Sequence, residues 1–433
     1  MAEPSKAVRG ALGRAKRATR HVVERVARPY VEEIVGRVSH PPAPAGWWDE
    51  PFPPVFVQLH ATLHEARTLA LADMPPGART MLSPGANGSW YFDWIEGTYG
   101  SVERHIAVEA FMPRPEELPD YVEWLEADIA ALGGVGDVAD SSIDLVYSGQ
   151  NVEHLWPEQM VAFFTETNRI LHDGGWLVVD SPNREVTAEL SWSMAEHTIE
   201  FAPDEVGRLF ELAGFELTTL KGVWLCREHG QLLPLDPLQD AGGAGSVLRR
   251  MVLANGRPED SFIWWAEGRR CADPDVAGLR ARIHDVFDAH WAERVSRLQV
   301  FGDRPRVHAP DGTTSVIAER GNAGDVLIGP WMALPAGTFA FEMDVSWRNR
   351  SGGGETVGTL EMRVGDDVLD ETAIKADADS GSTRLRVQAE LPGTRFGVHV
   401  LLRSLGNAEL EVPLTLSLSP DPWRAGDGNG RAS

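Results

Sequence analysis

The stretch that decides the fold is Ser141–Asn183, SSIDLVYSGQNVEHLWPEQMVAFFTETNRILHDGGWLVVDSPN. Its apolar runs at 143–147 and 176–179 are short and continuous, which is typical of strands buried in a parallel sheet. The segment between them has helical spacing, and its apolar face consists of Met160, Phe163, Phe164 and Leu171. Gly174–Gly175 is expected to close this helix, because glycine tolerates the positive φ of a helix C-cap. The stretch therefore predicts strand, polar loop, helix and strand.

Polar residues follow both expected strands. Ser148–Asn151 comes after the first strand and Asp180–Asn183 after the second. Ligands of open α/β sheets bind at the carboxyl ends of the strands. We therefore expect the two polar clusters to border one crevice, above a doubly wound and mostly parallel sheet.

The same residues carry a resemblance. The segments IDLVYSGQNVEHL at 143–155 and RILHDGGWLVVDSPN at 169–183 resemble the second half of a class I S-adenosylmethionine-dependent methyltransferase domain. The broad group it resembles methylates small molecules and glycans. The resemblance extends from Arg79 to Cys226. It implies a Rossmann-like fold and S-adenosylmethionine as the cofactor that donates the methyl group, and it does not specify the acceptor.

A glycine-containing turn at Ser83–Gly88 follows an expected strand at 79–82. In the family, backbone amides of such a turn approach the methionine part of the donor, as in dinucleotide-binding folds. This turn departs from the family pattern, because Leu82 replaces the usual acid and Ala86 replaces a glycine. The donor contacts that the resemblance implies here are Ser83, Gly85, Asn87 and Gly88.

Further donor contacts follow the next strands. Glu109 ends an expected strand at 104–108, and the resemblance implies hydrogen bonds from both ribose hydroxyls to this acid. Asp128 follows a strand at 122–125 and is expected to meet the adenine amino group, with Ile129 against the ring. The residues expected to line the other side of the donor are Ser148 and Gly149.

Acceptor chemistry points to two histidines. A hydroxyl nucleophile benefits from a general base with a pKa near neutral, and histidine is the usual choice. His197 lies in an insertion after the fifth strand, where related enzymes often cover the acceptor, and His154 follows the fourth strand. We prefer His197 as the base and keep His154 as the alternative. The candidate acceptor contacts are Gln150, Asn151, Asp180 and Glu196. No spacing of ligand-type residues is diagnostic of a metal, so we expect a metal-free transferase.

Composition limits the class of protein. The chain has 433 residues, enough for two or three domains, and a net charge of -24, which argues against nucleic acid as a partner. Its two cysteines, Cys226 and Cys271, exclude a disulfide scaffold and favour a reducing compartment, so we expect a cytoplasmic location. No apolar run reaches the length of a transmembrane helix, and the N-terminus lacks the apolar core of a secretory signal.

The first forty residues differ from the rest. Residues 1–40 contain nine Lys/Arg and four Glu, a balance of +5, and their apolar residues recur every three or four positions. This pattern predicts a basic amphipathic helix, which can contact an anionic membrane surface peripherally. The alternative is a solvated helix, or one packed on an acidic face of its own protein.

The remaining chain divides by pattern. Residues 41–273 are expected to form the methyltransferase domain. A helix at 56–73 leads into it, strands and helices alternate to about residue 230, and a hairpin is expected at 216–226. A long helix at 274–299 connects this domain to a region of period-two alternation at 300–420, which predicts an antiparallel β-sandwich. Residues 421–433 are rich in Pro, Gly and Ala, as disordered tails are.

The leading hypothesis is an O-methyltransferase that acts on a hydroxyl of a glycan or glycolipid. Segment Leu327–Gly337 resembles sandwiches attached to enzymes of bacterial surface polysaccharide synthesis, and Trp331 and Trp347 are candidates for stacking on sugars. Trp347 falls on the apolar stripe and is expected in the core. Two alternatives stay open: a non-catalytic binding or scaffold protein with a degenerate donor site, and a small-molecule or lipid methyltransferase whose sandwich mediates oligomerisation.

Overall fold

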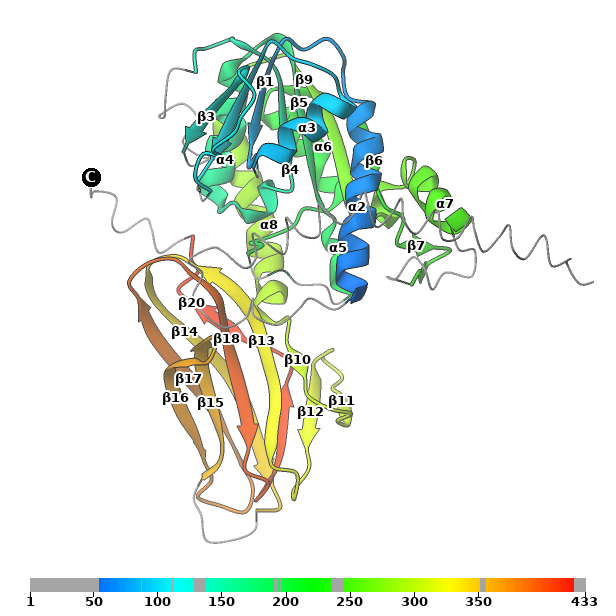
Figure 1. Ribbon diagram of the computed structural model, residues 1–433. Coiled ribbons are helices and arrows are strands. Elements are labelled where there is room, and N and C mark those ends of the chain that lie inside the picture. The colour runs from blue at the N-terminus through cyan, green and yellow to red at the C-terminus, as the bar shows by residue number, and fades with distance from the viewer. Residues whose placement is uncertain are drawn as a thin grey trace, which may run out of the picture. The chain divides into compact units, whose positions relative to one another are not determined.

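A computed structural model describes residues 54–86, 88–110, 112–127, 138–190, 194, 196–234, 244–350 and 356–423 (Figure 1). Several predictions from sequence lie outside these ranges: the basic helix at 1–40, the donor contacts Asn87, Asp128 and Ile129, and residues 424–433 of the tail. Residues Leu63–Ser433 form one compact unit, which contains the second part of helix α2 (Pro54–Ala72). Among the described residues, no helix combines the length and the apolarity needed to cross a bilayer.

The N-terminal part of this unit is built on a seven-stranded mixed sheet with the strand order β3-β2-β1-β4-β5-β9-β6. Strands β1 to β5 pair in parallel, whereas β9 is antiparallel to both of its neighbours. Its strands are β1 (Thr80–Pro84), β2 (Arg104–Glu109), β3 (Val122–Glu126), β4 (Ile143–Gly149), β5 (Leu171–Pro182), β6 (Phe215–Gly222) and β9 (Ile263–Arg270). The central strands are continuous apolar runs because both faces of the sheet are covered. This confirms the predicted Rossmann-like sheet.

Helices cover the sheet (Figure 1). The indole of Trp94 on α3 donates to Thr68 on α2, while α4 and α6 both contact α8. The predicted apolar face of α4 is buried at Met160, Phe163 and Phe164. The helices besides α2 are α3 (Ser89–Thr98), α4 (Pro157–Ile170), α5 (Arg184–Glu189), α6 (Pro203–Leu212), α7 (Ala244–Ala254) and α8 (Val276–Val295), with short 3-10 helices η2 (Val152–His154) and η3 (Pro258–Asp260).

The predicted helix end at Gly174–Gly175 is wrong. Helix α4 ends at Ile170, and Leu171 already has extended backbone angles and pairs with Ile143. Because of that pairing, the chain enters the sheet three residues before Gly174. Gly174 has a φ of 78° and lies within β5, where the register with β4 shifts. The glycine therefore serves a bend in a strand and not a helix cap.

The predicted hairpin at 216–226 is also wrong. Strand β6 ends at Gly222, and its antiparallel partner is β9, about forty residues further along the chain. Residues Ile263–Ala266 of β9 are buried. Strand β9 lies between β5 and β6 and pairs with both, so β6 does not pair with the residues that directly follow it. The small separate ribbon of β7 (Arg227–Glu228) and β8 (Gln231–Leu232) follows instead.

Two antiparallel sheets form the C-terminal β-sandwich, as the alternation predicts. Their orders are β10-β13-β18-β15-β16 and β11-β12-β19-β14-β17, with β20 beside β14. All five apolar residues on one face of β14, including Trp347, are buried, so Trp347 belongs to the core. The strands are β10 (Gln299–Val300), β11 (Arg306–His308), β12 (Thr314–Ala318), β13 (Gly324–Leu334), β14 (Gly337–Arg348), β15 (Thr356–Val364), β16 (Asp367–Lys375), β17 (Gly381–Leu391), β18 (Arg395–Ser404), β19 (Glu409–Pro413) and β20 (Ser417–Ser419). The domain boundaries themselves stay a prediction.

Candidate active site

The turn after β1 depends on its glycines. Gly85 has a φ of 70° and donates its amide to the carbonyl of Val108 at 2.8 Å. A Cβ at Gly85 would lie 2.2 Å from the Asn151 side-chain oxygen, so only glycine fits. Gly88 has a φ of 91° and stands at the N-cap of α3. The predicted order of strand, turn and helix is therefore present. Leu82 and Ala86, the two departures from the family pattern, are both fully buried.

Ser83 and Glu109 stand at the carboxyl ends of β1 and β2. The Ser83 hydroxyl lies 2.8 Å from Nε2 of His105, and both side chains are buried. Burial lowers the pKa of His105 to about 3, so this ring is neutral. Glu109 is the last residue of β2, and one of its oxygens accepts the Met112 amide at 3.3 Å.

Gln150 and Asn151 make hydrogen bonds to residues at the carboxyl ends of β1, β4 and β5. The Asn151 side-chain amide donates to the carbonyls of Pro84 at 2.7 Å and Gly149 at 3.1 Å. The Gln150 side chain donates to Asp180 at 2.7 Å, and its backbone amide donates to the Asp180 carbonyl at 2.8 Å. The structure therefore brings the two predicted polar clusters together at one edge of the sheet.

Asp180 is the centre of a buried polar network that the sequence did not reveal. Its carboxylate is fully buried and pairs with Arg67, whose Nε and Nη2 lie 3.0 and 3.1 Å from the two oxygens. The Tyr147 hydroxyl also donates to it, at 2.9 Å. Burial raises the pKa of Tyr147 well above its usual value. Arg67 precedes Asp180 by 113 residues, and no local pattern connects them. The carboxylate thus fixes the loop after β4, while its role toward an acceptor stays a prediction.

Ser148 and Gly149 form the end of β4 itself. The Ser148 hydroxyl is buried and has no hydrogen-bond partner within the part of the chain that the structure describes. A Cβ at Gly149 would lie 2.3 Å from Nη2 of Arg67 and 2.9 Å from Asp180, so the buried network excludes any larger residue.

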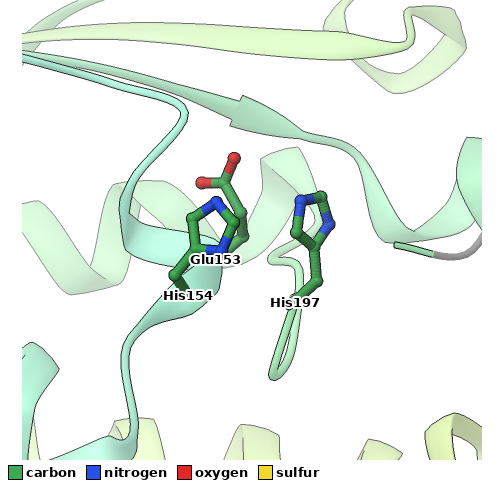
Figure 2. Close-up of side chains that lie close together, drawn as sticks. All are labelled: Glu153, His154 and His197. Carbon is green, nitrogen blue, oxygen red and sulfur yellow. The ribbon is translucent and has the colours of Figure 1, made fainter. Parts of the chain in front are cut away.

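His154 and His197, the two candidate bases, lie together. Their ring centroids are 4.9 Å apart, and their planes are nearly perpendicular. With Glu153 they form the Glu153 cluster, in which one ligand-type atom of each residue lies within 4.8 Å of the others (Figure 2). Glu153 and His154 come from η2, directly after β4, and His197 comes from the segment after α5. The insertion after the fifth strand therefore meets the loop after the fourth.

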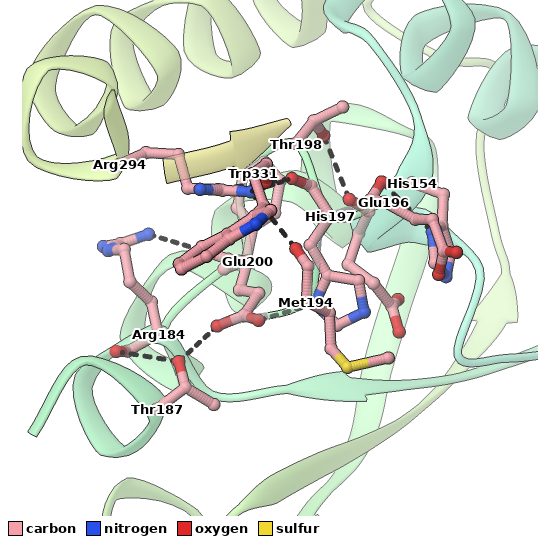
Figure 3. Close-up of polar contacts among 12 residues, drawn as sticks. His154, Arg184, Thr187, Met194, Glu196, His197, Thr198, Glu200, Arg294 and Trp331 are labelled. Carbon is pink, nitrogen blue, oxygen red and sulfur yellow. Dashed lines mark hydrogen bonds and ion pairs between the residues drawn. The ribbon is translucent and has the colours of Figure 1, made fainter. Parts of the chain in front are cut away.

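His197 is held by a carboxylate. Its Nδ1 donates to Glu200 at 2.6 Å, and both side chains are buried (Figure 3). Burial lowers the pKa of His197, but the hydrogen bond and the charge of Glu200 outweigh it, and the net effect is a raised pKa. Burial raises the pKa of Glu200, yet the same pairing lowers it to about 2. A histidine oriented in this way has the donor–acceptor geometry of a general base, with Nε2 available for a proton.

The backbone around His197 is held by Arg294 on α8. This guanidinium donates to the carbonyls of Met194 and His197 at 3.1 and 3.2 Å (Figure 3). It also reaches the carbonyl of Trp331 on β13 at 3.3 Å. Burial lowers the pKa of Arg294 to about 10, which leaves it charged at neutral pH. Arg294 and Glu200 were missed from sequence because neither belongs to a recognisable motif.

His154 has a different environment. Its Nδ1 donates to the carbonyl of Glu196 at 3.2 Å. Burial, with a smaller contribution from His197, lowers the pKa of His154 to about 3, so the ring is neutral. Burial also raises the pKa of the Glu196 carboxyl. Of the two histidines, His197 therefore has the environment of a base near neutral pH.

Glu153 is the residue of this cluster that sequence reasoning overlooked. It is fully buried, and neither carboxylate oxygen has a hydrogen-bond partner among the described residues. Burial raises the pKa of Glu153 to about 7. The available signal was an acid directly before His154 in the loop after a buried strand.

Comparison with known proteins agrees with the fold. Residues 102–179 match a family described as a methyltransferase domain. This segment runs from just before β2 to the middle of β5 and contains Glu109, Ser148, Gly149 and the first two residues of the Glu153 cluster.

Similar curated proteins occur in mycobacteria. Over 120 residues the chain is 33% identical to a probable S-adenosylmethionine-dependent methyltransferase from Mycolicibacterium smegmatis, a match that covers 26% of this chain and 41% of the relative. A similar protein from Mycobacterium tuberculosis is 30% identical over 139 residues, which is 30% of this chain and 44% of the relative. The chain thus spans less than half the length of the curated relatives it matches.

Solved structures are more distant. A SAM-dependent methyltransferase from Archaeoglobus fulgidus aligns with 17% identity and a TM-score of 0.34, over 49% of this chain and 94% of that protein. A didemethyltoxoflavin N1-methyltransferase from Burkholderia thailandensis aligns with 12% identity and a TM-score of 0.32, over 63% of this chain and 93% of that protein.

Proposed function

Since the chain contains a methyltransferase domain of the S-adenosylmethionine-dependent class, we propose that it transfers a methyl group to a hydroxyl of a glycan or glycolipid. The observation that carries the hydroxyl assignment is the His197–Glu200 pair, 2.6 Å apart and buried beside the carboxyl edge of the sheet. A hydroxyl nucleophile needs to lose a proton during methyl transfer, and a carboxylate-oriented imidazole is suited to take it.

The residues at the sheet edge fit a donor with a sulfonium, a ribose and an adenine. Gly85 and Gly88 adopt positive φ angles in the turn that follows β1. The Glu109 carboxylate ends β2, where it can accept hydrogen bonds from ribose hydroxyls. The buried Ser148 hydroxyl lacks a hydrogen-bond partner among the described residues, so a donor bound at this edge can supply one. With Asn87, Asp128, Ile129 and Gly149, these residues make up the proposed donor site.

The proposed reaction is an in-line displacement at the donor methyl carbon. The acceptor oxygen forms a bond to this carbon as the carbon–sulfur bond breaks, and the sulfur keeps the bonding pair. His197 Nε2 takes the hydroxyl proton, and Glu200 stabilises the imidazolium that forms. Gln150, Asn151, Asp180 and Glu196 surround the position of the acceptor in this proposal. His154 is neutral and positions its neighbours.

The glycan acceptor is supported by the appended sandwich. Trp331 on β13 stays partly exposed, unlike Trp347, and its ring lies 5.8 Å from that of His399. Aromatic faces at a sheet surface suit the apolar faces of sugars. The cytoplasmic location and the peripheral membrane contact through residues 1–40 belong to the same proposal.

Two measurements test donor binding and transfer. Isothermal titration with S-adenosylmethionine should give one site per chain. Glu109→Ala should weaken the affinity for the donor by about tenfold or more, because a charged hydrogen bond to the ribose is lost.

Transfer of a labelled methyl group to extracted cell-envelope glycans should fall about 100-fold or more in His197→Gln, with donor binding unchanged. Absence of heat with millimolar donor would contradict the enzyme and favour the scaffold, which Leu82 and Ala86 motivate.

The acceptor class needs its own test. In the full chain, Trp331→Ala should reduce transfer to glycans and leave transfer to a small hydroxyl compound unchanged. Equal transfer to glycans by both proteins would favour the small-molecule or lipid methyltransferase, whose sandwich only mediates oligomerisation.

A further inference from the structure

We propose that the Glu153 cluster binds one divalent transition-metal ion through the Glu153 carboxylate and the Nε2 atoms of His154 and His197. Two imidazoles and one carboxylate are a ligand set that Zn²⁺ and Fe²⁺ both accept. This differs from the metal-free enzyme that the sequence led us to expect.

The ring orientations carry the proposal. The Nδ1 atom of each histidine is already engaged, by Glu200 in His197 and by the Glu196 carbonyl in His154. In each ring one nitrogen faces the space beside the Glu153 carboxylate (Figure 2), and the ion would replace the contact of the His154 ring with the Gln150 backbone. Metal-binding histidines typically donate their second ring N–H to a carboxylate or a backbone carbonyl, which fixes the tautomer and leaves the other nitrogen for the metal. Both partner types are present here.

The unpartnered carboxylate of Glu153 is the second, independent observation. Both of its oxygens are buried and lack hydrogen-bond partners among the described residues. A buried carboxylate without a hydrogen-bond donor is unfavourable, and a cation in the middle of the cluster would offset its negative charge.

The spacing suits an ion after a small adjustment. The three ligand-type atoms lie within 4.8 Å of one another. A tetrahedral ion with bonds of about 2.1 Å holds its ligand atoms about 3.4 Å apart. The three side chains would therefore need to approach one another by about 1 Å to bind an ion.

The consequence for methyl transfer rests on the function proposed above. Glu153 follows the loop of Gln150 and Asn151, so the ion would stand at the same edge of the sheet as the donor site. A metal that coordinates the acceptor hydroxyl favours its deprotonated form, as it does for bound water. In this state His197 is a metal ligand, and the hydroxyl proton would pass to solvent water instead.

The test uses the full chain, stripped with EDTA and dialysed. Titration with Zn²⁺ should show one site per chain that Glu153→Gln weakens at least tenfold, because the charged ligand is lost while the side-chain shape is kept. His284→Ala on α8 is the matched control, since His284 is a partly exposed histidine that pairs with Glu158 outside the cluster. Titration with Co²⁺ should add visible absorption bands that disappear in His154→Ala. Identical Zn²⁺ binding by the wild type and Glu153→Gln would overturn the proposal, as would binding that His284→Ala removes.

Loss of the metal site can be distinguished from misfolding of a variant and from failure of the proposed methyltransferase function. If Glu153→Gln has a lower melting temperature without metal, His197→Gln replaces it in the same titrations. Full methyl transfer in EDTA together with no specific Zn²⁺ site would overturn the metal site and leave the methyltransferase intact. A specific Zn²⁺ site without any S-adenosylmethionine binding would do the reverse.

Discussion

Single residues at the end of β4 show how closely the candidate site is packed. Gly149 has Arg67, Tyr147 and Asp180 so near that a methyl group would overlap all three. Such a contact is invisible in the sequence, because Arg67 lies on α2 and Asp180 on β5. The sequence located Gly149 in the site through its place after a buried strand, but the reason for the glycine is a buried ion pair formed by distant residues.

At the residue scale we expect Gly149→Ala to destabilise the protein. The new Cβ would lie 2.3 Å from Nη2 of Arg67 and would push this guanidinium away from Asp180. Overpacking of this kind costs about 1–3 kcal/mol of unfolding free energy, measurable by urea denaturation. Gly97→Ala in α3 is the control, because nothing lies within 4 Å of its Cβ position. Equal stability of the two variants would show that the ion pair adapts to the extra methyl.

At the scale of elements, patterns that are local in the chain were predictable. The strands at 143–147 and 176–179, the apolar face of α4 and the alternation of β14 were all recognised, because each pattern reflects which face of one element is buried. The two wrong elements depended on distant pairing. Leu171 joins β5 because Ile143 is opposite, and β6 pairs with β9 and not with its own neighbour.

The same reasoning applies to the site. The sequence predicted that Glu109 and Ser148 lie at strand ends, and the structure places them there, while the roles proposed for them and for His197 stay predictions. Arg67, which pairs with Asp180, and Glu200 and Arg294, which contact His197, were not predicted, because hydrogen-bond partners depend on the folded geometry and leave no periodic signal.

Asp144 offers a test of how β1 and β4 are joined. Its carboxylate accepts the backbone amides of Arg79 and Thr80, both at 2.8 Å, at the start of β1. Burial raises the pKa of Asp144, but these amides and His172 lower it below its ordinary value of 3.8. A group with a lowered folded pKa stabilises the protein above its unfolded pKa and loses this contribution as the pH falls through the folded pKa.

We therefore expect Asp144→Asn to lower the unfolding free energy by about 1 kcal/mol at pH 7. Below pH 3.8 the difference from the wild type should shrink, because the wild-type carboxylate becomes protonated as well. Urea unfolding at pH 7 and at pH 3 measures both values. A difference that stays constant between the two pH values would contradict a role of the charge.

At the scale of the molecule, helix α8 contacts both the mixed sheet's helices and the end of the sandwich. Trp423, which follows β20, packs against Trp291 of α8 with ring centroids 4.6 Å apart and lies 5.3 Å from Phe287. Its ring also stacks near Trp156, at the start of α4. Trp423 is buried, although it belongs to the segment 421–433 that the sequence composition predicted to be disordered.

Trp423→Ala should destabilise the full chain by about 3 kcal/mol, the usual cost of truncating a buried aromatic side chain. Phe301→Ala is the control, because Phe301 is an exposed aromatic residue of the sandwich. Urea unfolding followed by tryptophan fluorescence and by far-ultraviolet circular dichroism measures both variants. Similar stability of the two would mean that the contacts of Trp423 with α8 contribute little.

Arg294 has a consequence for any exchange of domains. One guanidinium donates to the carbonyls of Met194 and His197 on one side and to that of Trp331 on the other. A chimaera that replaced residues 300–420 with a foreign sandwich would remove the acceptors at Pro330 and Trp331 and allow the arginine to tilt. Such a graft would therefore change turnover even for acceptors that never touch the sandwich, and the C-terminal region is not an interchangeable module.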